Sequence, residues 1–424
     1  MTSRASIVVT GTEVLTGRVS DRNGPWLAEQ LRLAGVDIAQ VVVVGDRPDD
    51  LFESLRYLAG TGVDLLITSG GLGPTADDLT ADVVARFQGR SPVLDVELEQ
   101  RIAAIIARLS VGRGWRTDPA ATAAATRKQA MVPIGARVLA PIGTAPGLVV
   151  PVAGGRSGPP VLVLPGPPRE VHHMWPVAMA DPIVQAALAG RTELRQRTIR
   201  LWGTPESELA ATLRDHESAL SGLEITTCLR GGELEIVTRF RPEAQQAYDE
   251  LDAVLRSAYP DTLFSADGRT IDEIVADALL AQGRTIVTAE SCTAGLLGAR
   301  LTDRPGSSAY VLGGLIAYSN EVKQNVLGVP AEVIDRLGAV SAEVAVAMAS
   351  GVRTWLGADI GVGITGVAGP GGGTATKPVG LVHLCASDSA RAVAREVHIP
   401  GSRADVRTRS VTIAMHMVRE LLLA

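Results

Sequence analysis

The residues that most clearly suggest chemistry lie in Thr288-Ala-Glu-Ser-Cys-Thr-Ala-Gly295. A β-branched run ends there in small and hydroxyl residues, and an apolar helical pattern follows. Ser291 is therefore expected at the carboxyl end of a strand and beside a helix N-terminus, where free backbone N–H groups can hold an oxyanion or a phosphate. The alternative interpretation is that Ser291 and Thr293 only cap the helix.

Lysine usage favours the chemical interpretation. Of the 40 basic residues only three are lysine, namely Lys128, Lys323 and Lys377. Arginine does not release its proton at working pH, so a lysine in an arginine-rich chain suggests a site that needs a deprotonatable amine. Lys323 follows a predicted strand, with Asn320 as the expected N-cap, and the helix dipole would lower the pKa of its amine. Such an amine can activate a serine as a base, although a single lysine can also be an ordinary solvated residue.

Two other features nearby have competing interpretations. Cys292 is an alternative nucleophile, but no histidine lies near it in the sequence, although one could approach it in the folded protein. Gly361–Gly366 fits the GxGxxG pattern of dinucleotide-binding proteins, and Asp388 follows about twenty residues later. Because Pro370 and three glycines come directly afterwards, no helix can open there, and the segment is interpreted as a glycine-rich substrate loop.

A second candidate site lies at Gly70-Gly-Leu-Gly-Pro-Thr-Ala-Asp-Asp-Leu-Thr80, directly after the expected strand Leu65–Ser69. Its glycines let the backbone approach a phosphate, and a helix beginning near Asp77 would offer N–H groups. The paired carboxylates Asp77 and Asp78 could hold Mg²⁺ on an adjacent phosphate. The alternative is a plain helix start. Other turns at strand ends are Gly11–Leu15, which contains Glu13 and is followed by Gly17, Asp21 and Asn23, and Gly143–Gly147.

Composition excludes several classes of protein. Hydrophobic residues make up 46% and charged residues 20% of the chain, which is ordinary for a globular protein, and aromatics are only 3%. The net charge of −6 and the lack of a dense basic block argue against a nucleic-acid partner. No apolar run reaches the ~18 residues of a membrane helix, and no signal peptide is expected. The separated cysteines Cys228, Cys292 and Cys385 predict reduced thiols in a cytoplasmic protein.

The elements that must position these residues follow from hydrophobic periodicity. The 424 residues should form two or three domains. Residues 1–165 alternate between strand and helix patterns, which predicts βαβ units around a mainly parallel sheet. The expected strands are Ser6–Thr10, Ile38–Val44, Leu65–Ser69 and Val161–Leu164, and the expected helices are Arg22–Leu33, Asp49–Leu58 and Asp78–Phe87.

Residues 190–265 predict a small α+β connector, and a second α/β block follows. The connector should contain strands Arg197–Leu201, Ile225–Leu229 and Glu233–Phe240, a tight turn at Gly231-Gly232, and helix Glu206–Asp215 after Thr204-Pro205. The second block should contain helices Ile271–Gln282, Gly295–Leu301, Glu321–Leu327, Ala342–Leu356 and Ala404–Leu423, and strands Thr285–Ala289, Leu312–Tyr318, Ile360–Ile364 and Gly380–Cys385.

Four segments together resemble the C-terminal domain of the CinA family: Thr288–Gly295, Tyr318–Lys323, Gly363–Pro370 and Lys377–Gly380. The resemblance implies a nicotinamide mononucleotide deamidase without a cofactor, in which Ser291 is the nucleophile, Lys323 the base and Tyr318 a neighbour that orients substrate or lysine. It also implies that Arg403 and Arg407 suit the nucleotide phosphate. Further residues expected at the substrate are Thr293, Gly295, Thr365, Gly366 and Gly369. Ala294 departs from the glycine that the family commonly has.

The N-terminal segments, together with Arg127–Ala130 and Leu164–Glu170, resemble the N-terminal domain of the same family. That domain is related to the molybdopterin-binding fold, and the resemblance implies metal-dependent cleavage of ADP-ribose to AMP and ribose 5-phosphate. Ser20–Asn23 departs from the family's usual Val-Asn-Thr-Asn, which leaves the substrate preference open. The residues expected to bind nucleotide or phosphate are Glu13, Asn23, Gly70, Gly71, Gly73, Thr75, Thr80 and Lys128, with Asp77 and Asp78 on the metal.

These expectations give an α/β chain of three domains: 1–170 molybdopterin-binding-like, 171–267 a small α+β connector, and 268–424 the deamidase. The family also implies a homodimer that acts on small-molecule nucleotides. Two alternatives come from other classes of protein. The N-terminal domain could be a pterin- or nucleotide-binding module without hydrolytic activity, or the chain could be a regulator of competence or DNA repair, as the family's name suggests.

Overall fold

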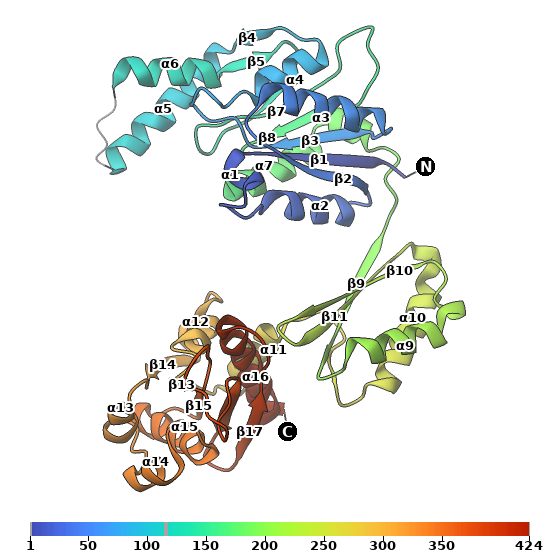
Figure 1. Ribbon diagram of the computed structural model, residues 1–424. Helices are drawn as coiled ribbons and strands as arrows, with labels where there is room; N and C mark the ends of the chain where they lie inside the picture. The colour runs from blue at the N-terminus through green and yellow to red at the C-terminus, as the bar shows by residue number, and fades with distance from the viewer. Residues whose placement is uncertain (1, 114–117, 424) are drawn as a thin grey trace. The chain divides into compact units, whose positions relative to one another are not determined.

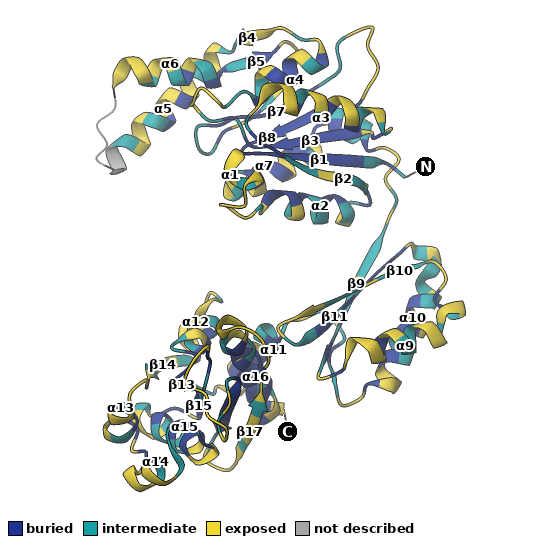
Figure 2. Ribbon diagram, in the orientation of Figure 1, coloured by how far each residue is buried: buried dark blue, intermediate teal, exposed yellow. Residues whose placement is uncertain are grey.

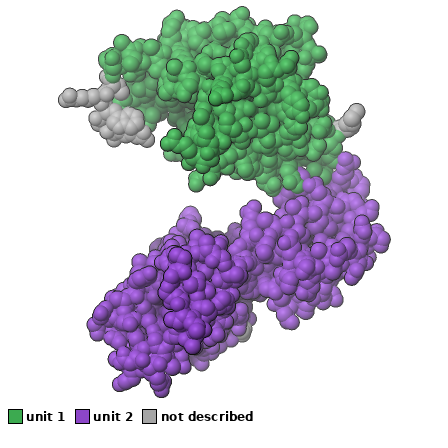
Figure 3. Space-filling model, viewed as in Figure 1, with its two compact units in different colours: residues 1–195 green, residues 196–424 purple. Residues whose placement is uncertain are grey.

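The computed structural model describes residues 2–113 and 118–423, and the chain divides into two compact units, residues 1–195 and 196–424 (Figure 3). The first unit extends beyond the expected boundary at residue 170. Helices α7 (Pro168–Ala180) and α8 (Pro182–Ala187) pack their apolar side chains on the first sheet and therefore belong to the first unit. The connector and the C-terminal region together form the second unit.

The first unit contains a six-stranded sheet in the order β2-β1-β3-β8-β7-β6 (Figure 1). Four neighbouring strands are parallel, as expected, whereas the last two pair antiparallel. The strands are β1 (Arg4–Thr10), β2 (Asp37–Val44), β3 (Leu65–Ser69), β8 (Val161–Leu164), β7 (Gly147–Val150) and β6 (Arg137–Leu139). A separate two-stranded sheet pairs β4 (Pro92–Leu94) with β5 (Met131–Pro133).

Helices cover both faces of this sheet, which gives three layers. Alternate residues of β1 point to opposite faces: Ile7 and Val9 belong to one apolar cluster and Val8 to the other. Helices α2 (Asn23–Leu33), α7 and α8 supply the first cluster, and α3 (Pro48–Gly60), α4 (Thr80–Gln88) and α5 (Val96–Arg113) supply the second. Figure 2 shows the resulting buried strands between helices with exposed outer faces. The remaining helices are α1 (Thr12–Leu15) and α6 (Pro119–Gln129).

The connector in the second unit is a four-stranded sheet in the order β10-β11-β9-β12, with its helices packed on it. Its strands are β9 (Arg195–Trp202), β10 (Leu223–Arg230), β11 (Glu233–Phe240) and β12 (Leu263–Ser265), and its helices are α9 (Glu206–Asp215) and α10 (Gln245–Ala258). Gly231 and Gly232 form the tight turn of the β10–β11 hairpin, and both have positive φ.

The C-terminal block is a five-stranded sheet in the order β14-β13-β15-β16-β17. The three strands that carry the candidate site are parallel, and β16 and β17 continue the sheet antiparallel. The strands are β13 (Ile286–Glu290), β14 (Val311–Ile316), β15 (Ile360–Gly366), β16 (Leu381–Ser387) and β17 (Ala392–His398). The helices are α11 (Ile271–Gln282), α12 (Leu296–Thr302), α13 (Asn320–Asn325), α14 (Ala331–Leu337), α15 (Ala342–Leu356) and α16 (Arg403–Leu423).

Three local expectations need correction. Helix α4 begins at Thr80, so Asp77 and Asp78 lie in the preceding turn and not in a helix. Ser319, not Asn320, caps α13, because its side chain accepts the Val322 N–H. The N-cap of α9 is Pro205 and not the preceding threonine.

Among the helices of residues 2–113 and 118–423, none combines the length and the apolar character that crossing a bilayer requires.

Candidate functional site

The centre of the C-terminal site is a contact between Ser291 and Lys323. Ser291 follows directly after β13, and its N–H donates to the Ile364 carbonyl on β15 at 2.9 Å. Lys323 lies on α13, which follows β14 on the other side of β13. Its Nζ atom is 3.2 Å from Ser291 Oγ and 2.8 Å from the Ala317 carbonyl oxygen. The topology thus brings together the two residues that the sequence selected.

The Lys323 amine is buried without a charged partner. The side chain is 1% exposed, and its third hydrogen-bond partner is the Tyr318 carbonyl at 3.2 Å. Burial lowers the pKa of Lys323, because removing an ammonium from water disfavours its charged form. The expected direction is therefore right, and burial is its main cause. Since two carbonyls accept hydrogen bonds from the amine, its neutral form keeps a lone pair available toward Ser291.

A buried carboxylate that the sequence analysis missed holds the start of α12. Glu290 is 1% exposed, and its side chain accepts the N–H groups of Gly295 and Leu297 at 3.0 Å each and of Gly298 at 2.8 Å. The expectation that these N–H groups are free for an oxyanion or a phosphate is therefore wrong. The available signal was an acidic residue between the predicted strand Thr285–Ala289 and the predicted helix Gly295–Leu301.

Residues 291–294, here called the nucleophile loop, reverse the chain between β13 and α12. Ala294 has φ +50° and Gly295 has φ +91°. Ala294 is the one non-glycine residue with positive φ in the described ranges. The loop therefore adopts a backbone that glycine accommodates with less strain.

The two arginines expected at a phosphate both contact main-chain carbonyls. On α16, Arg407 donates from Nε to Cys292 O at 3.1 Å and from Nη2 to Thr293 O at 2.9 Å. One turn earlier, the exposed Arg403 donates to Gly369 O at 2.8 Å. Helix α16 thus supports both loops that border Ser291.

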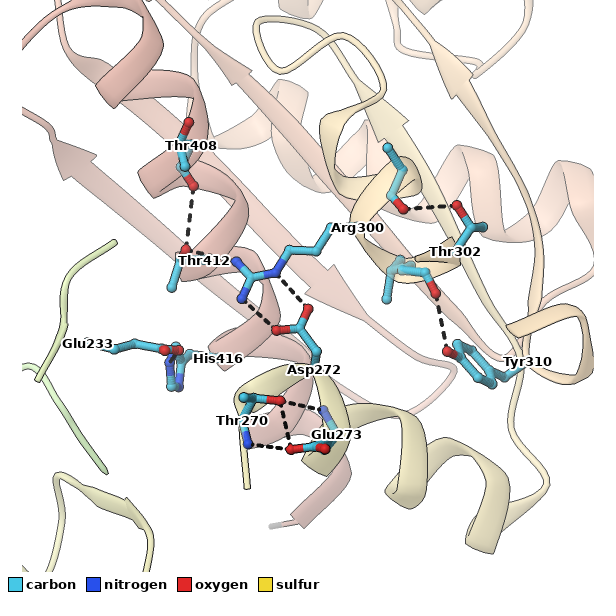
Figure 4. A network of polar contacts seen from close by, with 12 residues as sticks. Glu233, Thr270, Asp272, Glu273, Arg300, Thr302, Tyr310, Thr408, Thr412 and His416 are labelled. Carbon is cyan, nitrogen blue, oxygen red and sulfur yellow. Dashed lines mark hydrogen bonds and ion pairs between the residues drawn. The ribbon is translucent and has the colours of Figure 1, made fainter. Parts of the chain in front are cut away.

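Helix α16 is itself fixed by a polar network (Figure 4). Arg300 of α12 forms two hydrogen bonds with Asp272 of α11 and donates to Thr412 Oγ1 of α16 at 2.9 Å. Further along α16, His416 is 2.8 Å from Glu233 of the β10–β11 hairpin. The nucleophile loop, three helices and the connector are therefore linked through α16.

The other expected substrate residues have different environments. Thr365 Oγ1 donates to Ala339 O at 2.7 Å, which ties β15 to the start of α15. Thr293 is buried, and within the described chain its hydroxyl has no hydrogen-bond partner. Gly366 leaves no room for a Cβ, which would lie 2.8 Å from Leu381 O, and Gly369 would place one 2.5 Å from Val379 Cγ1. The Tyr318 side chain is 61% exposed, so its carbonyl and not its phenol contacts Lys323.

Cys292 is a poor nucleophile in this structure. Its side chain lies in the apolar cluster beneath the sheet, and burial raises the pKa of the Cys292 thiol to about 11. A thiol with that pKa is almost entirely protonated near neutral pH. The geometry therefore favours Ser291 over Cys292.

In the first unit, the glycines after β3 allow close backbone packing. Gly70 and Gly71 have positive φ, and added Cβ atoms would lie 2.4 Å from Thr10 O and 2.1 Å from Thr80 Oγ1. Thr80 is buried at the start of α4, and its N–H donates to Gly71 O at 3.1 Å. A cavity of about 440 Å³ opens above this loop. Its lining includes the expected residues Glu13, Gly70, Gly71, Gly73, Thr75, Asp77 and Asp78, together with Glu170.

The two aspartates of this loop differ. Asp78 accepts the Thr75 N–H at 2.9 Å and is also hydrogen-bonded to the Thr75 hydroxyl, whereas Asp77 is exposed. No group of three His, Cys, Asp or Glu side chains that could hold a metal occurs in residues 2–113 and 118–423. The chain alone thus forms no closed metal cage, but a pair of carboxylates fits Mg²⁺ when substrate phosphates complete its coordination.

Asn23 and Lys128 are not among the residues that line the 440 Å³ cavity. Asn23 is buried and donates to Ser69 Oγ at 2.9 Å and to Gly166 O at 2.7 Å, and its Oδ1 has no partner within the described chain. Lys128 donates to Thr75 O. All three lysines of the chain donate to main-chain carbonyls next to candidate loops, since Lys377 contacts Leu337 O.

In comparisons with known proteins, two family models match separate parts of the chain. Residues 268–422 match the family model described as CinA C-terminal domain, and residues 6–185 match the one described as Probable molybdopterin binding domain. A CinA-like protein of Mycobacterium sp. (strain MCS) is 58% identical over 100% of this chain and 99% of its own length. A CinA-like protein of Mycobacterium tuberculosis is 56% identical over 100% of this chain and 98% of its own.

Among solved structures, the competence/damage inducible protein CihA from Agrobacterium tumefaciens is 38% identical. The similarity covers 36% of this chain and 94% of that one, with a TM-score of 0.35.

Proposed function

The chain belongs to the CinA family, and on that premise we propose that its C-terminal region is a nicotinamide mononucleotide deamidase that uses Ser291 and Lys323. The observation that carries the proposal is the 3.2 Å contact between the buried Lys323 amine and Ser291 Oγ. A hydroxyl beside an amine of lowered pKa is the arrangement needed for nucleophilic attack on an amide.

In the first half-reaction, Ser291 Oγ attacks the carboxamide carbon of the nicotinamide group while its proton passes to Lys323 Nζ. The tetrahedral intermediate then collapses as its carbon–nitrogen bond breaks. The leaving nitrogen takes the proton from Lys323 and departs as ammonia, and a nicotinoyl ester remains on Ser291. Lys323 acts first as the base and then as the acid, because its pKa lies below the ordinary lysine value.

In the second half-reaction, water attacks the ester and Lys323 accepts a proton from that water. The ester bond breaks, Ser291 recovers its proton from Lys323, and nicotinic acid mononucleotide leaves. The carbonyls of Ala317 and Tyr318 hold the amine in place through both steps, since each accepts a hydrogen bond from Nζ.

Ammonia release from nicotinamide mononucleotide by the purified full chain tests this proposal. We expect turnover without added metal, because every group in the steps above is a side chain or a main-chain atom. A protein that folds but releases no ammonia from this substrate would refute the deamidase.

For the first unit we propose cleavage of ADP-ribose to AMP and ribose 5-phosphate. What supports it is the glycine loop that lines the 440 Å³ cavity, where the lack of side chains at Gly70 and Gly71 lets the loop pack against Thr10 and Thr80 while its backbone borders the cavity. Asp77 and Asp78 would hold a Mg²⁺ ion there, which would neutralise phosphate charge. Glu170 lines the same cavity, and burial raises the pKa of its carboxyl.

The competing proposal for this unit is a binding module for a pterin or nucleotide, which the molybdopterin-binding-like domain also allows. Release of AMP from ADP-ribose, with and without Mg²⁺, separates the two. Metal-stimulated AMP release supports the hydrolase, and tight pterin binding without AMP release supports the binding module.

A further inference from the structure

Arg407 of α16 is hydrogen-bonded to the nucleophile loop. Its guanidinium donates from Nε to the Cys292 carbonyl at 3.1 Å and from Nη2 to the Thr293 carbonyl at 2.9 Å. Two of its three nitrogens are thus occupied by main-chain atoms, and the residue is only partly exposed. A planar fork that spans two consecutive carbonyls fixes the orientation of both peptide planes.

That orientation matters for the N–H groups of the loop. A trans peptide holds its C=O and N–H on opposite sides, so the N–H groups of Thr293 and Ala294 point away from Arg407. The neighbouring donors are already engaged: Ser291 N–H with Ile364 O, and the first turn of α12 with the Glu290 carboxylate. The Thr293 N–H faces the Cys292 thiol, so it is the second of these peptides, which carries the Ala294 N–H, whose donor an oxyanion beside Ser291 could use.

We propose that Arg407 is a positioning residue for Ser291 and the N–H groups of its loop, and not a ligand of the substrate phosphate. The proposal rests on the deamidase function proposed above. Arg403 differs from Arg407, because it is exposed and contacts a single carbonyl, that of Gly369. Of the two arginines, Arg403 is the one placed to meet a phosphate.

The test compares two substrates that differ only in the phosphate, nicotinamide mononucleotide and nicotinamide riboside. A positioning residue acts on the attack itself, so Arg407→Gln should lower kcat for both substrates by the same factor, roughly 10²-fold, the scale of a disturbed oxyanion site. Arg403→Gln should raise KM for the mononucleotide and leave the riboside unaffected. A loss in Arg407→Gln that is confined to the mononucleotide, or no loss, would overturn the proposal.

A second measurement does not depend on activity. Hydrogen exchange of the amides of residues 292–298 should quicken in Arg407→Gln and in Arg407→Lys, because lysine lacks the two-pronged donor. The matched control is Arg395→Gln, which removes an exposed arginine paired with Glu420 and should change neither exchange nor kcat. Unchanged exchange in both Arg407 variants would overturn positioning. If the wild-type chain deaminates neither substrate, the deamidase fails and exchange alone decides the role of Arg407.

Discussion

Lys323 Nζ lies 3.2 Å from Ser291 Oγ although the two residues are 32 positions apart in the chain. They meet because β13 and β14 are neighbouring parallel strands whose carboxyl ends share one edge of the sheet. The segment after β13 carries the Ser291 hydroxyl, and the segment after β14 carries the Lys323 amine, so both groups lie at that edge.

Removing the nucleophile should abolish deamidation. Ser291→Ala deletes the attacking oxygen, so ammonia release should fall to background while mononucleotide binding persists, as calorimetry would show. Cys292→Ala is the matched control and should keep most activity, because burial holds the Cys292 thiol protonated with a pKa of about 11. The reverse result would assign the reaction to the cysteine.

Replacing Lys323 separates base function from charge. Lys323→Arg keeps a cation that cannot release its proton, so the rate should drop by roughly 10²-fold or more, the scale of losing a general base. In the wild type, the reactive form is the neutral amine, whose fraction grows as pH rises. The rate should therefore increase with pH through the pKa of Lys323, which burial places below the ordinary lysine value. An active arginine variant with a flat pH profile would contradict the base role.

Removing the two carboxylates of the first unit should affect only that unit's reaction. Asp77→Asn combined with Asp78→Asn should abolish Mg²⁺-stimulated AMP release from ADP-ribose, because the amides lack the charge that holds the ion. Deamidation should persist, since the residues of that site lie in the other unit. AMP release that survives in the double variant would show that the metal, if used, is held elsewhere.

Neutralising Glu290 should destabilise the C-terminal region and slow the reaction. Glu290→Gln replaces one of the two carboxylate oxygens with an NH₂ group that cannot accept a hydrogen bond. The oxygen lost is either Oε1, which accepts the Gly298 N–H, or Oε2, which accepts the N–H groups of Gly295 and Leu297. We expect a loss of about 2 kcal/mol in the free energy of unfolding, the scale of a hydrogen bond to a charged group. Urea denaturation measures it, and a variant as stable as the wild type would show that the carboxylate is not needed.

The backbone of Ala294 predicts a stabilising change. Alanine at φ +50° is strained by about 1 kcal/mol relative to glycine, although glycine also gains entropy in the unfolded chain. Ala294→Gly should therefore unfold at an equal or higher temperature. Ala294→Val should unfold at a lower one, because β-branching worsens the clash. A valine variant as stable as the glycine variant would argue against strain at this position.

Much of the fold could be predicted from periodicity. Strands such as Leu65–Ser69 and Val161–Leu164 are continuous apolar runs bounded by turn residues, and their observed bounds agree with expectation. Helices α5 and α10 were not predicted. In α5 the apolar residues are interspersed with alanines, and in α10 they form a short stripe within a polar segment. The first unit continues past residue 170 because Pro168 opens α7, whose apolar side chains pack on the first sheet.

The candidate site was only partly predictable for a different reason. Residue type and scarcity were enough to select Ser291 and Lys323, because reactive groups are recognised by their chemistry. The roles of Glu290 and Arg407 depend on which backbone atoms face them, and those contacts span up to 115 positions in the chain. A sequence pattern carries no direct signal of a side chain that binds a distant carbonyl.

The contacts of His416 with the connector determine where the chain can be truncated without exposing apolar surface. Its ring is 2% exposed, stacks on Trp202 at 4.0 Å between centroids, and meets Glu233, so its environment is built by the connector. A fragment that begins at residue 268 would leave this ring and the adjoining apolar face of α16 open to water. A fragment that begins at residue 196 keeps this contact, and shorter C-terminal fragments are expected to aggregate or to need a partner that replaces the missing hairpin.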